Sequence, residues 1–173
     1  MTNQVRPTSK EYAEHYEPYV GRVPDGDIVE FLEQQIERTV KILLDATPEQ
    51  AGFRYEPSKW TTKEVIGHMG DVERIMIYRA LRFSRGDHTP LPTMYEDDYV
   101  ANGNFNERSV QSLVDELVAI RKGSIALFAG LADVAWDRTG TASGATVSVR
   151  ALAYIIAGHE LHHLDILNRR YLV

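Results

Sequence analysis

The chain of 173 residues contains no cysteine. It therefore cannot form a disulfide, use a cysteine nucleophile or bind a metal ion through thiolates. Basic side chains are also few, because 19 Lys and Arg stand against 25 Asp and Glu, for a formal net charge of −6. Since binding to nucleic acid depends on a basic face, we expect no nucleic-acid partner.

Long apolar runs are absent as well. The longest, residues 151–157, is far shorter than the roughly 20 residues that a membrane-spanning helix requires. The first seven residues lack the apolar core of a signal peptide. We therefore expect no membrane partner and a cytoplasmic location, with which the lack of cysteine agrees.

The rest of the composition is that of an ordinary globular protein, with 43% hydrophobic and 25% charged residues. The length favours one domain over residues 1–173, with a sizeable core. Residues 1–24 carry three prolines and three tyrosines without periodicity. We expect these residues to form an extended arm that lies across the domain.

Four later stretches repeat apolar residues at the helical period, about residues 25–46, 61–86, 106–131 and 147–172. The second has the clearest start, because the segment Thr61 to Glu64 is typical of a capping box. These patterns predict an all-α fold, a four-helix bundle.

The connection between the second and third helices is unusually long. Residues 87–106 can span roughly 66 Å when extended, more than the roughly 38 Å length of a 25-residue helix. The two helices can therefore run parallel, which gives an up-down-down-up order. Asp97, Asp98 and Tyr99 in this crossover either overhang a pocket or are solvated loop residues. Residues 139–144 are small and polar, and we expect a flexible connection that allows a short hairpin without requiring one.

The last helix carries two histidines on its inward face. Leu152, Ile156, His159, His163 and Ile166 recur at steps of four and three residues. A buried imidazole must find partners for its nitrogens, since an unpartnered polar group costs roughly 1–3 kcal/mol. Two imidazoles on adjacent turns suit one shared divalent metal ion. They also suit two core histidines, each bonded to a carbonyl, a carboxylate or water, and the pair alone favours that alternative.

The segment from His159 to His163 also matches the HExxH signature of zinc proteases, whose glutamate is the general base. Those enzymes take a third ligand from further along the chain. Asp165 lies roughly 200° around the helix from His163 and cannot join the same ion. Glu160 lies about 100° from His159, at the edge of the inward stripe. A protease is therefore disfavoured.

A third ligand is better sought upstream, where His68 is the other histidine on an inward helical face. Three neutral imidazoles would leave further coordination positions open to water or substrate, as in catalytic metal sites. Gly67 and Gly70 flank His68 and provide either space for the site or close helix packing. We do not expect the remaining histidines to be ligands, because they lie in the arm, in a loop and to one side of the stripe: His15, His88 and His162.

Two segments together resemble the DinB superfamily, particularly its YfiT-like putative metal-dependent hydrolases. These are Pro57 to Met69 (PSKWTTKEVIGHM) and His159 to His163 (HELHH), and the resemblance covers about residues 53–171. It implies a four-helix bundle of up-down-down-up topology, a metal site formed by His68, His159 and His163, and nickel or zinc as the ion. It also implies a homodimer.

The family resemblance leads us to expect a metal-dependent hydrolase that acts on an unknown small molecule. Glu160 or a carboxylate of the crossover is the candidate base, and no catalytic residue is assigned. One alternative is a metal-dependent S-transferase that uses bacillithiol, mycothiol or glutathione. Arg79, Arg82 and Arg85 either hold the carboxylates of such a thiol or form a solvated helix face. The other alternative is a noncatalytic bundle that binds a metal or ligand.

Overall fold

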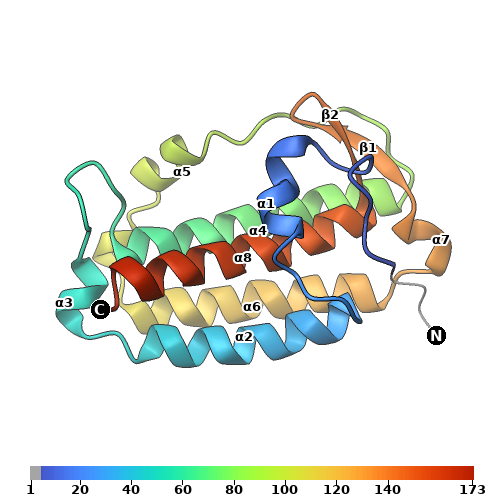
Figure 1. Ribbon diagram of the computed structural model, residues 1–173. Coiled ribbons are helices and arrows are strands. Elements are labelled where there is room, and N and C mark those ends of the chain that lie inside the picture. Colours follow the sequence, from blue (N-terminus) through green and yellow to red (C-terminus); the bar gives the residue numbers. More distant parts are fainter. Residues whose placement is uncertain (1–4) are drawn as a thin grey trace.

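The structure is a computed structural model that describes residues 5–173. Four long helices form a bundle, as predicted: α2 (Ile28–Leu44), α4 (Thr62–Ser84), α6 (Val110–Ala129) and α8 (Val149–Arg170) (Figure 1). The structure confirms the helical fold. Among the described residues, no helix combines the length and apolarity needed to cross a bilayer.

Each long helix begins at a side chain that caps its free amide groups. Asp27 caps α2, Ser109 caps α6 and Ser148 caps α8. Thr61 and Glu64 form the predicted capping box at the start of α4, since each side chain accepts a hydrogen bond from the other residue's amide group.

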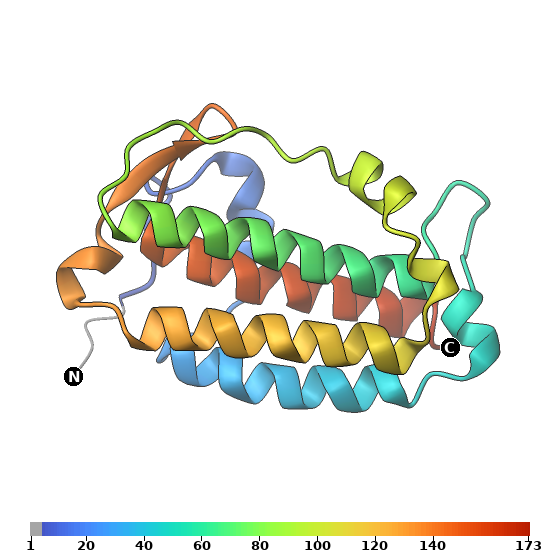
Figure 2. The same cartoon turned by 180° about the vertical axis from the view of Figure 1, so that it is seen from behind.

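Hydrogen bonds between elements show how the helices are oriented. Asn106, just before α6, accepts a hydrogen bond from Thr61 Oγ1 (2.7 Å) at the start of α4. Gln35 of α2 donates to the carbonyl of Ala157 in α8 (2.9 Å), and one turn later Thr39 donates to Glu160. The colour gradients of Figures 1 and 2 agree: α4 and α6 run side by side in one direction, while α2 and α8 run in the other.

In the part of the chain that the structure describes, eight short elements precede or connect the long helices. They are η1 (Glu14–Tyr16), α1 (Glu17–Val20), α3 (Pro48–Gly52), α5 (Glu96–Asn102), η2 (Phe105–Glu107), α7 (Asp133–Trp136), β1 (Thr139–Ala142) and β2 (Ala145–Ser148). The crossover thus contains two helical segments, α5 and η2, where no pattern was visible in the sequence. The connection before α8 is a true hairpin.

The hairpin ties the crossover to the end of the bundle. Strands β1 and β2 pair antiparallel, with Ala142 opposite Ala145, so Ser143 and Gly144 form a two-residue turn. Both turn residues have positive φ, 53° and 77°, as type I′ hairpin turns require. Leu91 of the crossover donates to the carbonyl of Thr141 and accepts from the amide of Ser143. The crossover is therefore bound to the outer edge of the hairpin.

The N-terminal arm packs against α8. Its first four residues lie outside the described part of the chain. From there it lies across the bundle and includes the two short helices η1 and α1 (Figure 1). A Cβ at Gly158 would overlap the backbone carbonyl of Tyr19, so α8 and the arm approach as closely as a glycine allows.

The two glycines beside His68 serve packing. The Phe105 ring occupies the place where a Cβ of Gly67 would lie, and a Cβ at Gly70 would come within 3.2 Å of Ile120 on α6. Of the two explanations for these glycines, space for the site or close packing, the close approach of the crossover and of α6 therefore supports packing.

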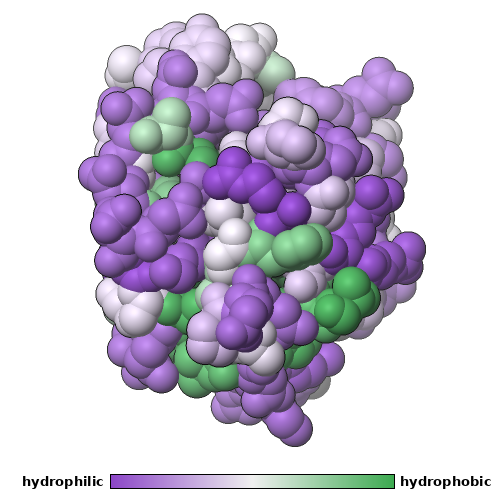
Figure 3. Space-filling view, turned by 90° about the vertical axis from the view of Figure 1, so that its left-hand side faces the viewer, coloured by the Kyte–Doolittle hydropathy of each residue, from purple (hydrophilic) through white to green (hydrophobic). Residues whose placement is uncertain are grey.

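The core consists of two apolar clusters separated by a polar layer. One cluster lies towards the hairpin and includes Phe83 and Leu152, and the other lies towards α3 and includes Leu43 and Leu164. Between them the four long helices contribute buried polar side chains: Gln35, Thr39, His68, Glu73, Arg121, Ser124, His159, Glu160 and His163. At the α3 end the surface is mainly hydrophilic with small apolar patches, and Phe53 and Val173 are exposed there (Figure 3).

We expect Gly158→Ala to lower the free energy of unfolding by about 1–3 kcal/mol, because the added methyl group forces the arm away from α8. Chemical denaturation monitored by circular dichroism measures the change.

Gly123→Ala is the matched control, because Gly123 also lies inside a long helix but has open space around its Cβ position. It should stabilise the protein by about 0.5–1 kcal/mol. Stability of Gly158→Ala at or above wild type would contradict the close approach.

Candidate metal centre

Three histidines from two helices converge in the polar layer. His68 extends from α4, and His159 and His163 extend from adjacent turns of α8. The Nε2 atom of His159 lies 3.1 Å from Nε2 of His68 and 3.1 Å from Nε2 of His163. The side chains are buried, with 2%, 6% and 9% of the surface of His68, His159 and His163 exposed. The structure therefore brings together the three histidines singled out in the sequence.

The spacing of these nitrogens fits a shared ion. Metal–imidazole bonds of about 2.0–2.1 Å place neighbouring ligand nitrogens roughly 3.0–3.4 Å apart. Hydrogen bonding alone explains the group less well, because the single Nε2 atom of His159 faces two partners at the same distance. Within the described residues, no oxygen atom forms a hydrogen bond with any of the three Nε2 atoms. The residues present therefore suit a divalent ion that prefers nitrogen ligands.

The outer nitrogen of His68 departs from the usual arrangement around a metal. A metal-bound histidine ordinarily donates its second N–H to a carboxylate, carbonyl or water. Here Nδ1 of His68 is buried and has no hydrogen-bond partner in the described chain. The ring packs instead against the indole of Trp60, with the ring centres 4.6 Å apart. Packing rather than hydrogen bonding therefore orients this imidazole.

Burial keeps the cluster neutral. It lowers the pKa of His68 to about 4. It lowers the pKa of His163 to about 3, with further contributions from His68 and His162. The pKa of His159 lies well below its usual value, first because of burial and then because of the neighbouring histidines. A neutral imidazole is the form that binds a metal, so protons compete for this site only in acidic solution.

The other described histidines lie outside the cluster. His162 is partly buried, and its ring contacts the rings of Tyr19 and His163 at 5.3 and 5.2 Å. His88 is exposed in the crossover. His15 is exposed too, but it borders the cavity beside the cluster, a placement that its sequence context did not reveal.

Glu160 is held away from the cluster by a buried ion network. Arg121 of α6 is fully buried and donates to both carboxylate oxygens of Glu73 (2.8 and 2.9 Å) and to Glu160. Thr39 donates to the other oxygen of Glu160. Burial raises the pKa of Glu160, while Arg121 and Thr39 oppose that rise. With both oxygens engaged, Glu160 is part of the helix packing and is not available as the general base proposed from the HExxH pattern.

A cavity of about 490 Å³ opens beside His159. Its walls come from five parts of the chain: the arm (His15, Tyr16, Tyr19), α4 (Val72, Met76, Arg79), the crossover (Thr93, Met94, Glu96), the hairpin (Ser143) and α8 (Ile155, His159). Tyr19 also contacts the His159 ring edge to face, with ring centres 5.4 Å apart. Burial raises the pKa of Tyr19, so its phenol stays protonated at neutral pH.

Several cavity residues carried no sequence signal. Tyr19, Glu96 and Ser143 lie on segments without periodicity, and only the close approach of the arm, the crossover and the hairpin brings them together. Asp97 and Asp98, the crossover carboxylates singled out in the sequence, are exposed and do not line this cavity.

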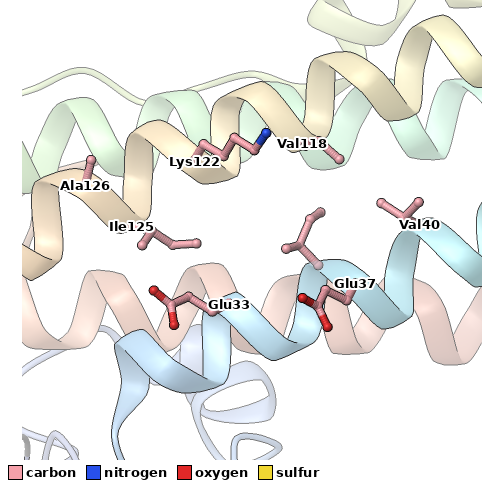
Figure 4. A pocket seen from close by; sticks show the side chains of 8 residues that line it. Glu33, Glu37, Val40, Val118, Lys122, Ile125 and Ala126 are labelled. Atoms are coloured by element: carbon pink, nitrogen blue, oxygen red, sulfur yellow. The ribbon is translucent and has the colours of Figure 1, made fainter.

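A second, larger groove lies between α2 and α6 on another side of the bundle. It has a volume of about 710 Å³ and is mainly apolar, with Ile36, Val40, Val118 and Ile125 among its lining residues. Figure 4 shows Glu33 and Glu37 on α2 and Lys122 on α6 at its edges. It contains no histidine, so its chemistry differs from that of the three-histidine cluster.

Comparisons with known proteins agree on the family and fold. The sequence model of the DinB superfamily matches residues 32–167. No curated protein matches the chain by sequence. Among solved structures, YfiT from Bacillus subtilis, described as a probable metal-dependent hydrolase with an unusual four-helix bundle topology, is 16% identical with a TM-score of 0.68. That match covers 95% of this chain and 93% of YfiT.

A second similar structure is a mycothiol-dependent maleylpyruvate isomerase, 14% identical with a TM-score of 0.67. The match covers 84% of this chain but 62% of the isomerase, so the similarity leaves a large part of that protein without a counterpart here. At these identities both structures show a shared fold.

We expect the metal-free protein to lose stability as pH falls from about 7 to 4. The unfolded chain takes up protons near the ordinary histidine pKa of about 6.5, whereas folded His68 and His163 do so only near pH 4 and 3. Each such group lowers the free energy of unfolding by on the order of 2–3 kcal/mol across that range. Urea denaturation at a series of pH values measures the slope.

The slope should be shallower in His68→Ala, and His88→Ala, which removes an exposed imidazole, is the matched control. Comparing variants cancels the contribution of carboxylates such as Glu160. An unchanged slope in His68→Ala would show that His68 titrates normally in the folded protein.

Replacing Arg121 by methionine should lower the free energy of unfolding by about 3–5 kcal/mol, because Glu73 and Glu160 would remain buried without their counter-ion. Lys122→Gln, at the next and exposed position of α6, should change it by no more than about 0.5 kcal/mol. Thermal or urea unfolding measures both, and a loss below about 1 kcal/mol in Arg121→Met would contradict the role of the network.

Proposed function

The chain belongs to the DinB superfamily, and we propose that it is a metal-dependent hydrolase that acts on a small molecule. The observation that carries the proposal is the convergence of three neutral, buried Nε2 atoms beside a cavity of about 490 Å³. In this proposal His68, His159 and His163 are the protein ligands. Nickel and zinc are the preferred ions, since imidazole nitrogen suits both.

When bound, the ion supplies Lewis-acid chemistry, since it polarises a carbonyl or related group and makes water more acidic. Three protein ligands leave coordination positions open for water and substrate. Catalytic metal sites have such open positions, whereas in structural sites protein ligands fill all of them. His159 is both a member of the cluster and part of the cavity wall, so a molecule in the cavity would lie beside the cluster.

The chain offers two groups for proton handling beside the site. Glu96 is the carboxylate of the crossover that lines the cavity, and it replaces Glu160 as the candidate proton acceptor. Tyr19, whose phenol stays protonated, lies against His159 and is a candidate hydrogen-bond donor to substrate. The arm that carries Tyr19 packs closely against α8 beside His159.

A metal-dependent S-transferase is the second candidate. The similar fold of the mycothiol-dependent maleylpyruvate isomerase supports it. Because this chain has no cysteine, the thiol would come from a cosubstrate such as mycothiol, bacillithiol or glutathione. A turnover screen of the metal-loaded protein with and without these thiols separates the two candidates, and failure to bind any substrate or thiol would favour a noncatalytic bundle.

Each of the single replacements His68→Ala, His159→Ala and His163→Ala should lower the metal content at least about tenfold. Loss of a group that only hydrogen-bonds to a ligand already weakens metal binding about tenfold or more, and loss of the ligand itself should cost more. Elemental mass spectrometry of purified protein without a histidine tag measures the content.

The His15→Ala, His88→Ala and His162→Ala variants are the matched controls and should retain the ion. Full retention in any variant of the proposed ligands, or loss in His162→Ala alone, would show that the ligand set is wrong.

A further inference from the structure

Arg79 lies on the same face of α4 as His68. Eleven residues separate them, about three helical turns or roughly 16 Å. The side chain lines the cavity beside His159 and is 3% exposed. Its guanidinium contacts Met76 on the preceding turn of α4, Pro92 of the crossover and Ser143 of the hairpin. Arg85, six residues further on at the C-cap of α4, is exposed by contrast.

The guanidinium of Arg79 has no counter-ion in the described chain. No carboxylate lies within ion-pair distance of it, and its protein partners are neutral: the carbonyl of Pro92 (3.0 Å), Ser143 Oγ (3.1 Å) and the sulfur of Met76 (3.7 Å). Its Nε–H forms no hydrogen bond with a described residue, yet that nitrogen is not among the buried side-chain atoms sealed off without a partner. At least one N–H group of Arg79 is therefore accessible to solvent, and the side chain lines the cavity beside His159.

The second buried arginine shows what a structural role looks like in this protein. Arg121 is as deeply buried as Arg79, but two carboxylates surround it, Glu73 and Glu160. Burying a charge without such a partner costs much more free energy than burying a pair. Arg79 lacks the compensation that Arg121 has.

The hairpin places a hydroxyl group beside this charge at a conformational cost. Ser143 has a φ of 53°, in the left-handed region that glycine and asparagine favour and other residues rarely adopt. Its hydroxyl accepts a hydrogen bond from Arg79 and keeps its own O–H free to donate into the cavity. The turn thus adds a second donor next to the guanidinium.

We infer that Arg79, assisted by Ser143, binds an anionic group of the substrate, a carboxylate or a phosphate. The inference rests on the proposed function, because it takes the cavity beside the cluster as the substrate site. The substrate is then an elongated small molecule, with its reacting group at the histidines and its negative charge towards the hairpin. Glu96 of α5 is the acidic residue among those that line the cavity, and its side chain is exposed, so that solvent screens its charge.

The test is anion binding by metal-free protein at neutral pH, measured as a rise in melting temperature at constant ionic strength. Inorganic phosphate and succinate are titrated separately against sodium chloride, so that saturation by one of them identifies the class of anion. In wild type at least one should saturate. In Arg79→Gln the apparent affinity should fall at least about tenfold, and Arg79→Lys should retain part of it.

Arg85→Gln is the matched control at the C-cap of the same helix and should bind within about twofold of wild type. Ser143→Ala removes a donor at the surface of the cavity and should weaken binding by severalfold, which keeps the test informative if Arg79→Gln does not fold. Equal, non-saturating responses in wild type, Arg79→Gln and Ser143→Ala would overturn the inference.

Metal content, measured on the same protein preparations before the metal is removed for the anion titrations, separates this inference from the proposed function. Metal retention without anion binding dependent on Arg79 would overturn the anion site and leave the hydrolase proposal in place. Anion binding dependent on Arg79 in a wild-type protein that retains no metal would overturn the hydrolase proposal instead.

Discussion

The compensation of buried charge in the middle of the bundle is the constraint on which the rest of the structure depends. Arg121 extends from α6 and meets Glu73 of α4 and Glu160 of α8, and it also donates to the carbonyl of Leu32 in α2. One guanidinium therefore contacts all four long helices at the same level. Since leaving any of these charges unpaired is costly, the network restricts how the helices can shift along one another. His159 precedes Glu160, so the same restriction sets the height of the histidines opposite His68.

This arrangement gives the residues of the HExxH pattern separate tasks. The two histidines face α4, while the glutamate between them turns towards α2 and α6 and becomes part of the packing. The 100° step between neighbouring helical residues makes this division possible. In a zinc protease the same glutamate must reach the water beside the ion, and here Thr39 and Arg121 occupy both of its oxygens. The chain therefore matches the HExxH pattern of zinc proteases, but Glu160 does not have the position that the glutamate needs in those enzymes.

The long helices hold the histidines, and the irregular segments build the cavity around them. The arm approaches α8 at Gly158, the crossover is bound to the hairpin through Leu91, and the hairpin places Ser143 against Arg79. Each of these contacts joins residues far apart in the sequence. The cavity consequently combines a neutral cluster at one end with an uncompensated positive charge at the other, an asymmetry that suits a small, negatively charged molecule.

The sequence by itself determined the parts that follow from local periodicity. Helical repeats place residues three and four apart on one face whatever the surroundings, so the four helices, the capping box at Thr61 and the inward position of His68, His159 and His163 could all be derived without coordinates. Only the tertiary structure decided which polar residues compensate one another. Glu160 looked like a candidate base until Arg121, 39 residues away, was seen to hold it, and Arg79 looked like its exposed neighbour Arg85 until the crossover and hairpin covered it. Partners of this kind carry no periodic signal, because the contacts that create them are made between elements and not along the chain.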